Sequence, residues 1–171
     1  MIDDRPKPDY RVGIGTDIHK TEIGKPLMLC GINIPYPMGL KGHSDGDVGI
    51  HAIVDALLGA SGNGDIGTLF PDTDPKYKNA DSKQFLVVVK ELLNDKGWDI
   101  VNVDVTIHAE APKLTNIKGQ MKRCISGILD INFCDVNIKA KTNEGLGDIG
   151  QGNAMAATAV ALIKKKYKRS L

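Results

Sequence analysis

Three stretches of the chain have the apolar and polar spacing of β-strands. They are Tyr10–His19, Val101–Glu110 and Val136–Lys141, and in the second one valine or isoleucine occupies every other position. A fourth stretch, Pro26–Tyr36, shows apolar alternation that is broken at Gly31-Ile32-Asn33. That interruption predicts a β-hairpin.

Four helices are expected between and after these strands. The first begins at Ser44, which forms a capping-box-like start with Asp47, and its apolar residues keep the helical period through about Ala60. The others are expected over 82–96, 116–129 and 153–168. Strands and amphipathic helices in this order predict an α/β fold, an α+β sandwich in which helices largely cover one face of a single sheet. The order also resembles a split βαβ plan.

The length and composition fit one domain that can fold without disulfides or a structural metal. We expect it over residues 10–168, between a flexible lead (1–9) and a short tail (169–171). A net charge of +1 and 5% aromatic residues give no general attraction to nucleic acid or membranes. No stretch approaches the roughly 20 apolar residues of a membrane span.

Cysteine usage indicates a reducing compartment. Cys30, Cys124 and Cys134 are odd in number and have no CxxC spacing, so neither a disulfide framework nor a thiolate zinc site is expected. We expect them to be small buried hydrophobes. Because the first residues also lack the apolar core of a signal peptide, a cytoplasmic protein is predicted.

Asp17, His19 and His51 form a candidate metal site. Asp17 and His19 are two residues apart, so on a strand they share a face, and His51 lies on the following helix. One carboxylate and two imidazoles with a fourth position open is a typical catalytic zinc set. Asp47 and Asp55, four residues either side of His51, are candidates to orient its ring. The alternative is that these side chains are caps or satisfied polar groups of the core.

The loops carry the remaining candidate chemistry. His43 precedes the expected helix start and is either a packed loop histidine or a donor to an anion there. Phe70-Pro71-Asp72-Thr73-Asp74-Pro75 is an acidic turn-rich loop. Lys113 and Lys141 follow strands, at the sheet edge where ligands commonly bind. Glu144 could ligate a hard cation such as Mg²⁺.

Seven co-linear motifs resemble one enzyme family. They are Asp17-Ile18-His19, His43 to Asp47, His51 to Ala60, Gly64 to Gly67, Phe70 to Pro75, Asn102 to Ile107, and Ala111-Pro112-Lys113. Together, from Arg11 to about Ile163, they resemble 2-C-methyl-D-erythritol 2,4-cyclodiphosphate synthase. The resemblance implies a ferredoxin-like subunit in a homotrimer with active sites at subunit interfaces. It also implies release of CMP from 4-diphosphocytidyl-2-C-methyl-D-erythritol 2-phosphate as the 2,4-cyclodiphosphate forms.

The resemblance also implies roles for individual residues. Asp17, His19 and His51 would bind zinc, Glu144 would help to hold Mg²⁺ or Mn²⁺ on the diphosphate, and His43 and Thr142 would stabilise the transition state with Ser44. The substrate-binding residues it implies are Ser44, Asp65, Ile66, Gly67, Phe70, Pro71, Asp72, Thr73, Asp74, Ala109, Ala111, Pro112, Lys113, Lys141 and Asn143. Because the attacking 2-phosphate is already anionic, no general base is required.

The chain departs from the family pattern after the last predicted strand. Lys141 and Asn143 replace usual threonines, Asp148 stands where phenylalanine is usual, and Gln151 where arginine is usual. Asn153 replaces a glutamate. In relatives the phenylalanine and arginine line a cavity on the trimer axis that can hold an isoprenoid diphosphate. Without that apolar wall and guanidinium fork, we expect such binding to be weak or absent.

Two other functions fit parts of the same sequence. One is a zinc-dependent phosphohydrolase, which would give an opened product where the synthase gives a cyclic one. The other is a non-enzymatic trimeric nucleotide-sensing module, which would need neither stoichiometric zinc nor CMP turnover.

Overall fold

The computed structural model describes residues 9–166. The expected lead, apart from Asp9, and the expected tail lie outside these residues. A five-stranded sheet has the order β4-β1-β7-β5-β6. Its members are β1 (Tyr10–Ile23), β4 (Met38–Leu40), β5 (Trp98–His108), β6 (Val136–Lys141) and β7 (Ala154–Lys165). A separate hairpin joins β2 (Leu27–Leu29) to β3 (Ile32–Ile34).

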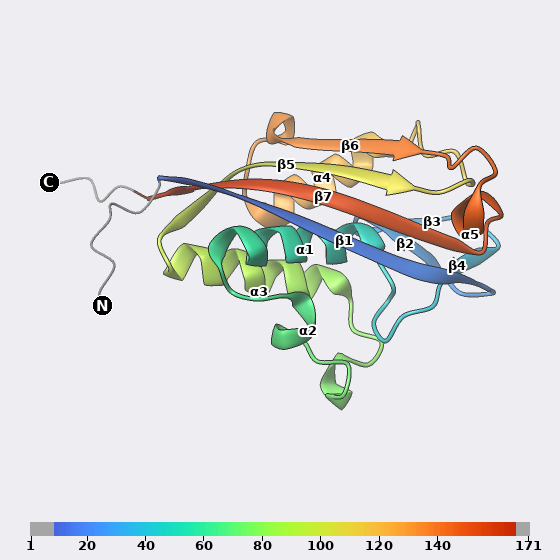
Figure 1. The fold of residues 1–171 in the computed structure, drawn as a ribbon, viewed down its shortest axis with the longest axis horizontal. Coiled ribbons are helices and arrows are strands. Elements are labelled where there is room, and N and C mark those ends of the chain that lie inside the picture. Colours follow the sequence, from blue (N-terminus) through green and yellow to red (C-terminus); the bar gives the residue numbers. More distant parts are fainter. Residues whose placement is uncertain (1–8, 167–171) are drawn as a thin grey trace, which may run out of the picture.

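The helices cover one face of the sheet (Figure 1). Helix α1 (Val48–Ser61) packs on β1, β7 and β5, and α3 (Ser82–Asp95) packs on α1. Helix α4 (Lys118–Leu129) packs on β6 and α3. The short elements are α2 (Ile66–Leu69), α5 (Gly147–Gly150) and two 3-10 turns, η1 (Pro75–Tyr77) and η2 (Phe133–Asp135). None of the helices in the described part of the chain is long and apolar enough to cross a membrane.

The expected split βαβ arrangement is confirmed. Strands β1 and β5 are each antiparallel to β7, which lies between them, so β1 and β5 run in the same direction. Strand β6 adds to β5 in parallel after α4. This topology places the carboxyl ends of β5 and β6 side by side at one end of the sheet. Strand β1 lies two strands away from β5.

The helix predicted over 153–168 is wrong, because 154–165 form the central strand β7. Alanine is the strongest helix former, and this segment is rich in it. The tertiary context overrides that preference. Ala157, Ala159 and Ala161 all face α1 and are 0–1% exposed, an alternation with the period of a strand. Their small size lets the helix lie close to the sheet.

Three further differences are local. The hairpin turns at Cys30-Gly31, one residue earlier than predicted, and both residues have positive φ (49° and 79°), as a type I′ turn requires. Strand β1 continues to Ile23 and pairs with β4, which the sequence patterns did not indicate. Of the three free cysteines only Cys30 is buried; Cys134 is exposed, so its expected burial is wrong.

Two glycines of β1 allow α1 to lie directly on the strand. A Cβ on Gly13 would sit 2.0 Å from the Ala56 carbonyl oxygen, and one on Gly15 would sit 2.1 Å from the Ala52 carbonyl oxygen. Real Cβ atoms do not approach oxygen so closely, so any larger residue would push the helix away from the strand. This close approach places the first turn of α1 beside the middle of β1.

We therefore expect Gly13→Ala to lower the free energy of unfolding by on the order of 3 kcal/mol, since the new Cβ would clash with the Ala56 oxygen and the Ala60 nitrogen, which both belong to the backbone. Gly59→Ala is the matched control, because its new Cβ would meet no atom closer than 3.9 Å. Urea unfolding of both variants measures the difference. A Gly13→Ala protein as stable as the Gly59→Ala protein would contradict the close approach.

Candidate metal centre and surrounding cleft

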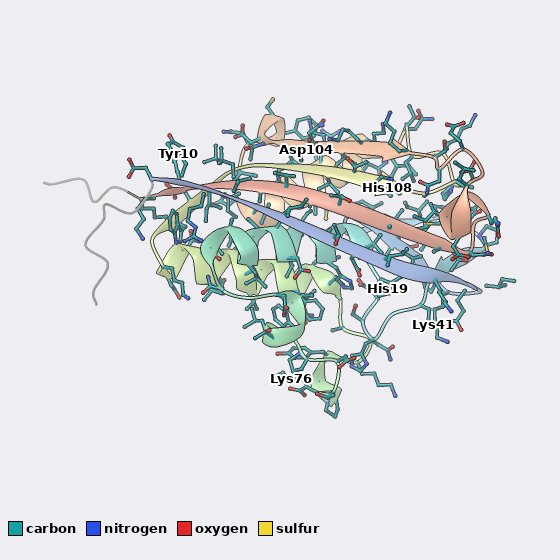
Figure 2. All side chains as sticks on the ribbon, viewed as in Figure 1. Tyr10, His19, Lys41, Lys76, Asp104 and His108 are labelled. Atoms are coloured by element: carbon teal, nitrogen blue, oxygen red, sulfur yellow. The ribbon has the colours of Figure 1, made fainter. Side chains whose placement is uncertain are left out.

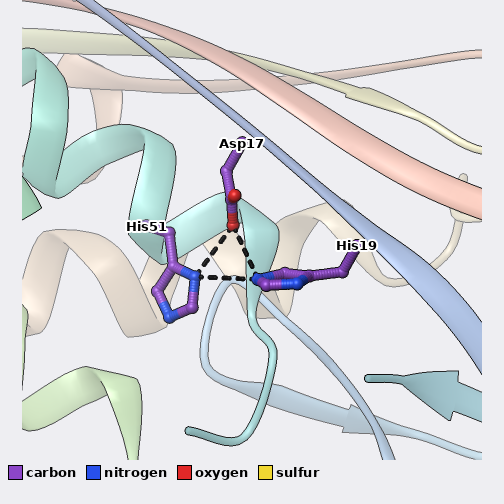
Figure 3. Close-up of side chains that lie close together, drawn as sticks. All are labelled: Asp17, His19 and His51. Carbon is purple, nitrogen blue, oxygen red and sulfur yellow. Dashed lines mark hydrogen bonds and ion pairs between the residues drawn. The ribbon is translucent and has the colours of Figure 1, made fainter. Parts of the chain in front are cut away.

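Asp17, His19 and His51 converge as the sequence predicted (Figure 3). Asp17 Oδ2 lies 2.8 Å from His51 Nδ1 and 3.0 Å from His19 Nε2, and the two ring nitrogens are 3.4 Å apart. Donor atoms bound tetrahedrally to zinc at about 2.0–2.1 Å are separated by roughly 3.3 Å. The triangle of three donor atoms therefore already has about the size that such an ion needs.

The charge on this group is set by its own hydrogen bonds. Burial raises the pKa of Asp17, but hydrogen bonds from His19 and His51 outweigh burial and hold that pKa well below its usual value. The hydrogen bond to Asp17 raises the pKa of His19. Asp17 is thus an ionised carboxylate, the form that ligates a metal. One oxygen and two imidazole nitrogens are a donor set that suits zinc.

Asp47 fixes the start of α1, four residues before His51. Its carboxylate is fully buried and accepts hydrogen bonds from the backbone nitrogens of Ile50 (3.0 Å), Cys30 (2.8 Å) and Gly31 (2.6 Å). The helix therefore begins at Val48 with Asp47 as its N-cap, and the predicted start at Ser44 is wrong. Asp47 also ties the hairpin turn to the helix, so it does not orient the His51 ring.

Asp55, the other carboxylate near His51, is also occupied elsewhere. Its Oδ1 accepts a hydrogen bond from the backbone nitrogen of Ile66 at 2.7 Å. Asp65 then caps α2 by accepting from the backbone nitrogen and hydroxyl of Thr68 at 2.8 and 2.7 Å. The segment 65–67 is held beside α1 by these bonds rather than left as a free loop.

Two serines contact the outer nitrogen of His51. Ser82 Oγ lies 2.8 Å and Ser44 Oγ 3.1 Å from His51 Nε2. Ser82 begins α3 and is fully buried. The sequence analysis missed Ser82, because a serine beside the N-cap Asp81 is ordinary at a helix start. No pattern in the chain signalled a contact with His51.

The metal group lies in a cavity of about 400 Å³. It is lined by Asp17, His19, His43, Ser44, His51, Asp55, Ile66, Gly67, Phe70, Asp72, Tyr77 and Phe85. Nine of these are predicted site residues, and they come from β1, α1, α2 and the loops between them. Phe70 stacks on Phe85 with ring centroids 4.5 Å apart, which forms an apolar floor under this side of the cavity.

Four other predicted residues flank this cavity without lining it. Asp65 and Asp74 cap α2 and η1, and Pro71 and Thr73 belong to the connecting loop.

His43 is exposed at the rim, and its carbonyl accepts from the backbone nitrogen of Asn79 at 2.8 Å. Because α1 begins five residues later, His43 does not lie at the helix terminus as expected.

Comparison with known proteins identifies the family. A model of the YgbB family matches residues 10–164. The chain belongs to the YgbB family. It is 50% identical over 156 residues to the 2-C-methyl-D-erythritol 2,4-cyclodiphosphate synthase of Bordetella petrii, covering 91% of this chain and 96% of that one.

Solved structures of similar proteins share the fold. IspF of Plasmodium falciparum, solved as a CDP complex, has a TM-score of 0.83 at 38% identity, covering 95% of this chain and 100% of that one. The bifunctional IspDF of Campylobacter jejuni has a TM-score of 0.89 at 41% identity. That match covers 94% of this YgbB-family chain and 43% of the bifunctional chain.

The other predicted residues of this family member form a second group at the ends of β5 and β6. Ala109 bonds to Lys141 through its backbone nitrogen (3.0 Å), Asn143 donates to Glu110 (3.2 Å), and Thr142 Oγ1 donates to Glu144 Oε1 (2.8 Å). Ala111, Pro112 and Lys113 follow in the loop after β5.

The second group lies far from the metal group within one chain. Asp17 pairs with Ala157, which pairs with Ile107, which pairs with Ala140. Three strand spacings of about 4.8 Å place Asp17 roughly 14 Å from Ala140 across the sheet. In Figure 2 the labels of His19 on β1 and His108 on β5 mark these separate strands. The structure therefore does not bring the two groups together in a single chain.

We expect Asp47→Ala to lower the free energy of unfolding by about 3 kcal/mol, because it removes a helix cap and leaves buried N–H groups of the hairpin turn unpaired. Asp81→Ala is the control, since Asp81 caps α3 through a single bond to the Lys83 nitrogen, and about 1 kcal/mol is expected there. Urea unfolding monitored by circular dichroism compares the two. Equal losses would contradict the second role of Asp47 at the hairpin.

Proposed function

We infer that this chain acts as a 2-C-methyl-D-erythritol 2,4-cyclodiphosphate synthase in isoprenoid biosynthesis. The observation that carries the inference is the convergence of Asp17, His19 and His51 in a cavity built from the family's other motifs. The reaction is attack of the substrate's 2-phosphate on the β-phosphate of its own diphosphate, with release of CMP. The relatives' printed names support this activity, and the CDP bound to the Plasmodium protein supports a cytidine nucleotide substrate.

Asp17 Oδ2, His19 Nε2 and His51 Nδ1 would hold a zinc ion. Zinc bound there supplies a Lewis acid for a phosphate oxygen of the substrate. The chain's own contribution is position and charge. Asp17 offers an ionised oxygen, and α1 presents His51 from the opposite wall of the same cavity. Ser44 and His43 lie at the rim, where a hydroxyl and an imidazole can donate to an anionic phosphate.

The erythritol part would lie against the 65–67 segment and the Phe70–Asp74 loop. Ile66, Gly67, Phe70 and Asp72 line the cavity, and Asp55 and Asp65 hold α2 in place through its backbone. A pocket that is fixed before binding lowers the entropy cost of folding the substrate into its reactive conformation. No side chain is needed to remove a proton, because the attacking phosphate is already anionic.

The cytidine and its phosphates would be received by the second group of residues, supplied by an adjoining subunit. These residues are Ala109, Ala111, Pro112, Lys113, Lys141, Thr142 and Asn143, with Glu144 holding Mg²⁺ or Mn²⁺. The roughly 14 Å between Asp17 and Ala140 within one chain supports this division, since the strand that leads to Glu144 lies three strand spacings from the metal group. The Thr142 hydroxyl, 2.8 Å from Glu144, would orient that carboxylate and then face the leaving phosphate.

A homotrimer is the proposed assembly. The face of the sheet opposite the helices carries exposed apolar side chains on β1, among them Val12 (67% exposed), Ile14 (67%) and Ile18 (59%). Val160 of β7, next to them in the sheet, is 40% exposed. Contiguous apolar side chains on a sheet face are typical of a surface that another chain covers.

We expect His51→Ala to abolish zinc binding and CMP release, because His51 supplies one of the three donor atoms. The fold should be kept, because the substitution removes only the imidazole ring. Zinc is measured by elemental analysis, and CMP and the cyclic product by chromatography and mass spectrometry with Mg²⁺ present, with and without a chelator. Normal CMP release from His51→Ala would refute the metal assignment. A ring-opened product from the wild-type protein would instead favour the phosphohydrolase.

We expect Ile14→Lys to convert the trimer to monomers, because three lysines would be buried at one interface. Each chain should keep its zinc but lose CMP release, since the second group of site residues is no longer supplied. Val88→Lys is the control, because Val88 is exposed on α3, on the helical side of the molecule. Light scattering after size-exclusion chromatography gives the mass. A monomeric wild-type chain that releases CMP would refute the shared site.

A further inference from the structure

We propose that Asp45 and Ser82 act as positioning residues that select the tautomer of the neutral His51 ring with its proton on Nε2, so that Nδ1 is free to ligate the metal. The proposal rests on the metal site of the proposed function. It follows from a line of hydrogen bonds that lies behind His51, on the side away from Asp17 and His19.

The direction of each hydrogen bond is fixed by Asp45. A carboxylate has no proton and can only accept. Asp45 Oδ1 accepts a hydrogen bond from the Ser82 hydroxyl, and Asp45 Oδ2 accepts one from the Ser82 backbone nitrogen at 3.1 Å. The single hydroxyl proton of Ser82 is therefore used toward Asp45. Only lone pairs of Ser82 Oγ remain for its other two neighbours, Ser44 Oγ at 3.4 Å and the nearer His51 Nε2.

The nearer neighbour of Ser82 Oγ is His51 Nε2, at 2.8 Å. Since Ser82 Oγ can only accept there, Nε2 carries the ring proton and Nδ1 carries a lone pair. Nδ1 is the atom that faces Asp17 Oδ2 and His19 Nε2. Asp45 and Ser82 thus select the His51 tautomer whose Nδ1 can bind a metal.

Without this selection the opposite tautomer would be favoured. Asp17 Oδ2 lies 2.8 Å from Nδ1, close enough to accept a hydrogen bond from a proton on that atom. A proton on Nδ1 would occupy the lone pair that the metal needs. Asp45 and Ser82 oppose Asp17, and their effect is to keep the donor atom open before any metal arrives.

The backbone holds Asp45 and Ser82 together. The loop before α1 and the segment before α3 are joined by hydrogen bonds from Asn79 nitrogen to His43 oxygen (2.8 Å) and from Asp45 nitrogen to Ala80 oxygen (3.1 Å). Ser82 is fully buried and does not line the cavity. Its hydroxyl therefore acts through His51 and does not touch substrate.

Ser44 has a different part in the same group. Its Oγ lies 3.1 Å from His51 Nε2 and lines the cavity, whereas no hydrogen bond joins its hydroxyl to Asp45 among the described residues. Its acceptor within the described residues is Ser82 Oγ, at a long 3.4 Å, so a ligand in the cavity can take that proton instead. The two serines separate two roles: Ser82 sets the ring of His51, and Ser44 faces the substrate.

Zinc affinity of purified protein, measured by competition with a chromophoric chelator, tests the proposal without relying on activity. Ser82→Ala and Asp45→Asn should each weaken zinc binding about 10- to 100-fold. The double variant should lose little more than either single one, because both changes break the same line of bonds. Ser126→Ala, which removes the hydroxyl of a buried serine on α4 that donates to the Arg123 carbonyl, should bind zinc as the wild type does.

Nitrogen-15 NMR of zinc-loaded wild-type protein with labelled histidine gives an independent readout if a variant fails to fold. We expect a proton on His51 Nε2 and a metal-shifted Nδ1. Zinc on Nε2 would overturn the proposal, as would wild-type zinc affinity in both single variants. So would a double variant whose fold-loss in zinc affinity is the product of the two single losses. A loss of zinc affinity in Ser44→Ala that Ser82→Ala lacks would also overturn it. Absence of zinc from the wild type would overturn the metal site itself and this proposal with it.

Discussion

The direct contact between the α1 backbone and β1 is the constraint on which the metal centre depends. Gly13 and Gly15 leave no side chain between helix and strand, so the helix carbonyls of Ala52 and Ala56 lie against the strand itself. His51 precedes Ala52, and Asp17 follows Gly15 by two residues on the same face. Their 2.8 Å contact is therefore a consequence of how closely these two elements pack. The alanines of β7 continue the same shallow surface under α1.

Aspartates that range from buried Asp47 to exposed Asp65 organise the loops around the cavity. Each accepts at least one hydrogen bond from a backbone N–H. The donor lies far along the chain for Asp47, Asp45 and Asp55, and three residues further on for Asp65. Such bonds give irregular segments fixed positions where no strand or helix does so. The result is a cavity whose walls are held by carboxylates other than Asp17, which remains free to serve as a ligand within it.

The sequence predicts the metal group better than it predicts the framework behind it. Alternation places Asp17 and His19 on one strand face, and helical spacing places His51 opposite them, because both arguments depend only on local geometry. The strand β7 is mispredicted because alanine propensity is local, whereas its position between β1 and β5 is set by pairing with distant residues. Ser82 is missed for the same reason: its contact with His51 joins two helix starts that spacing does not relate.

The position of β7 at the centre of the sheet also determines when the site can form during synthesis. Strand β1, which carries Asp17 and His19, pairs along most of its length with β7, the last strand among residues 9–166. Until β7 leaves the ribosome, the ligand-bearing strand has only the short β4 beside it. Contacts between the two ends of a chain close the largest loop and form late. The metal centre of each new chain is therefore completed only after β7 has left the ribosome.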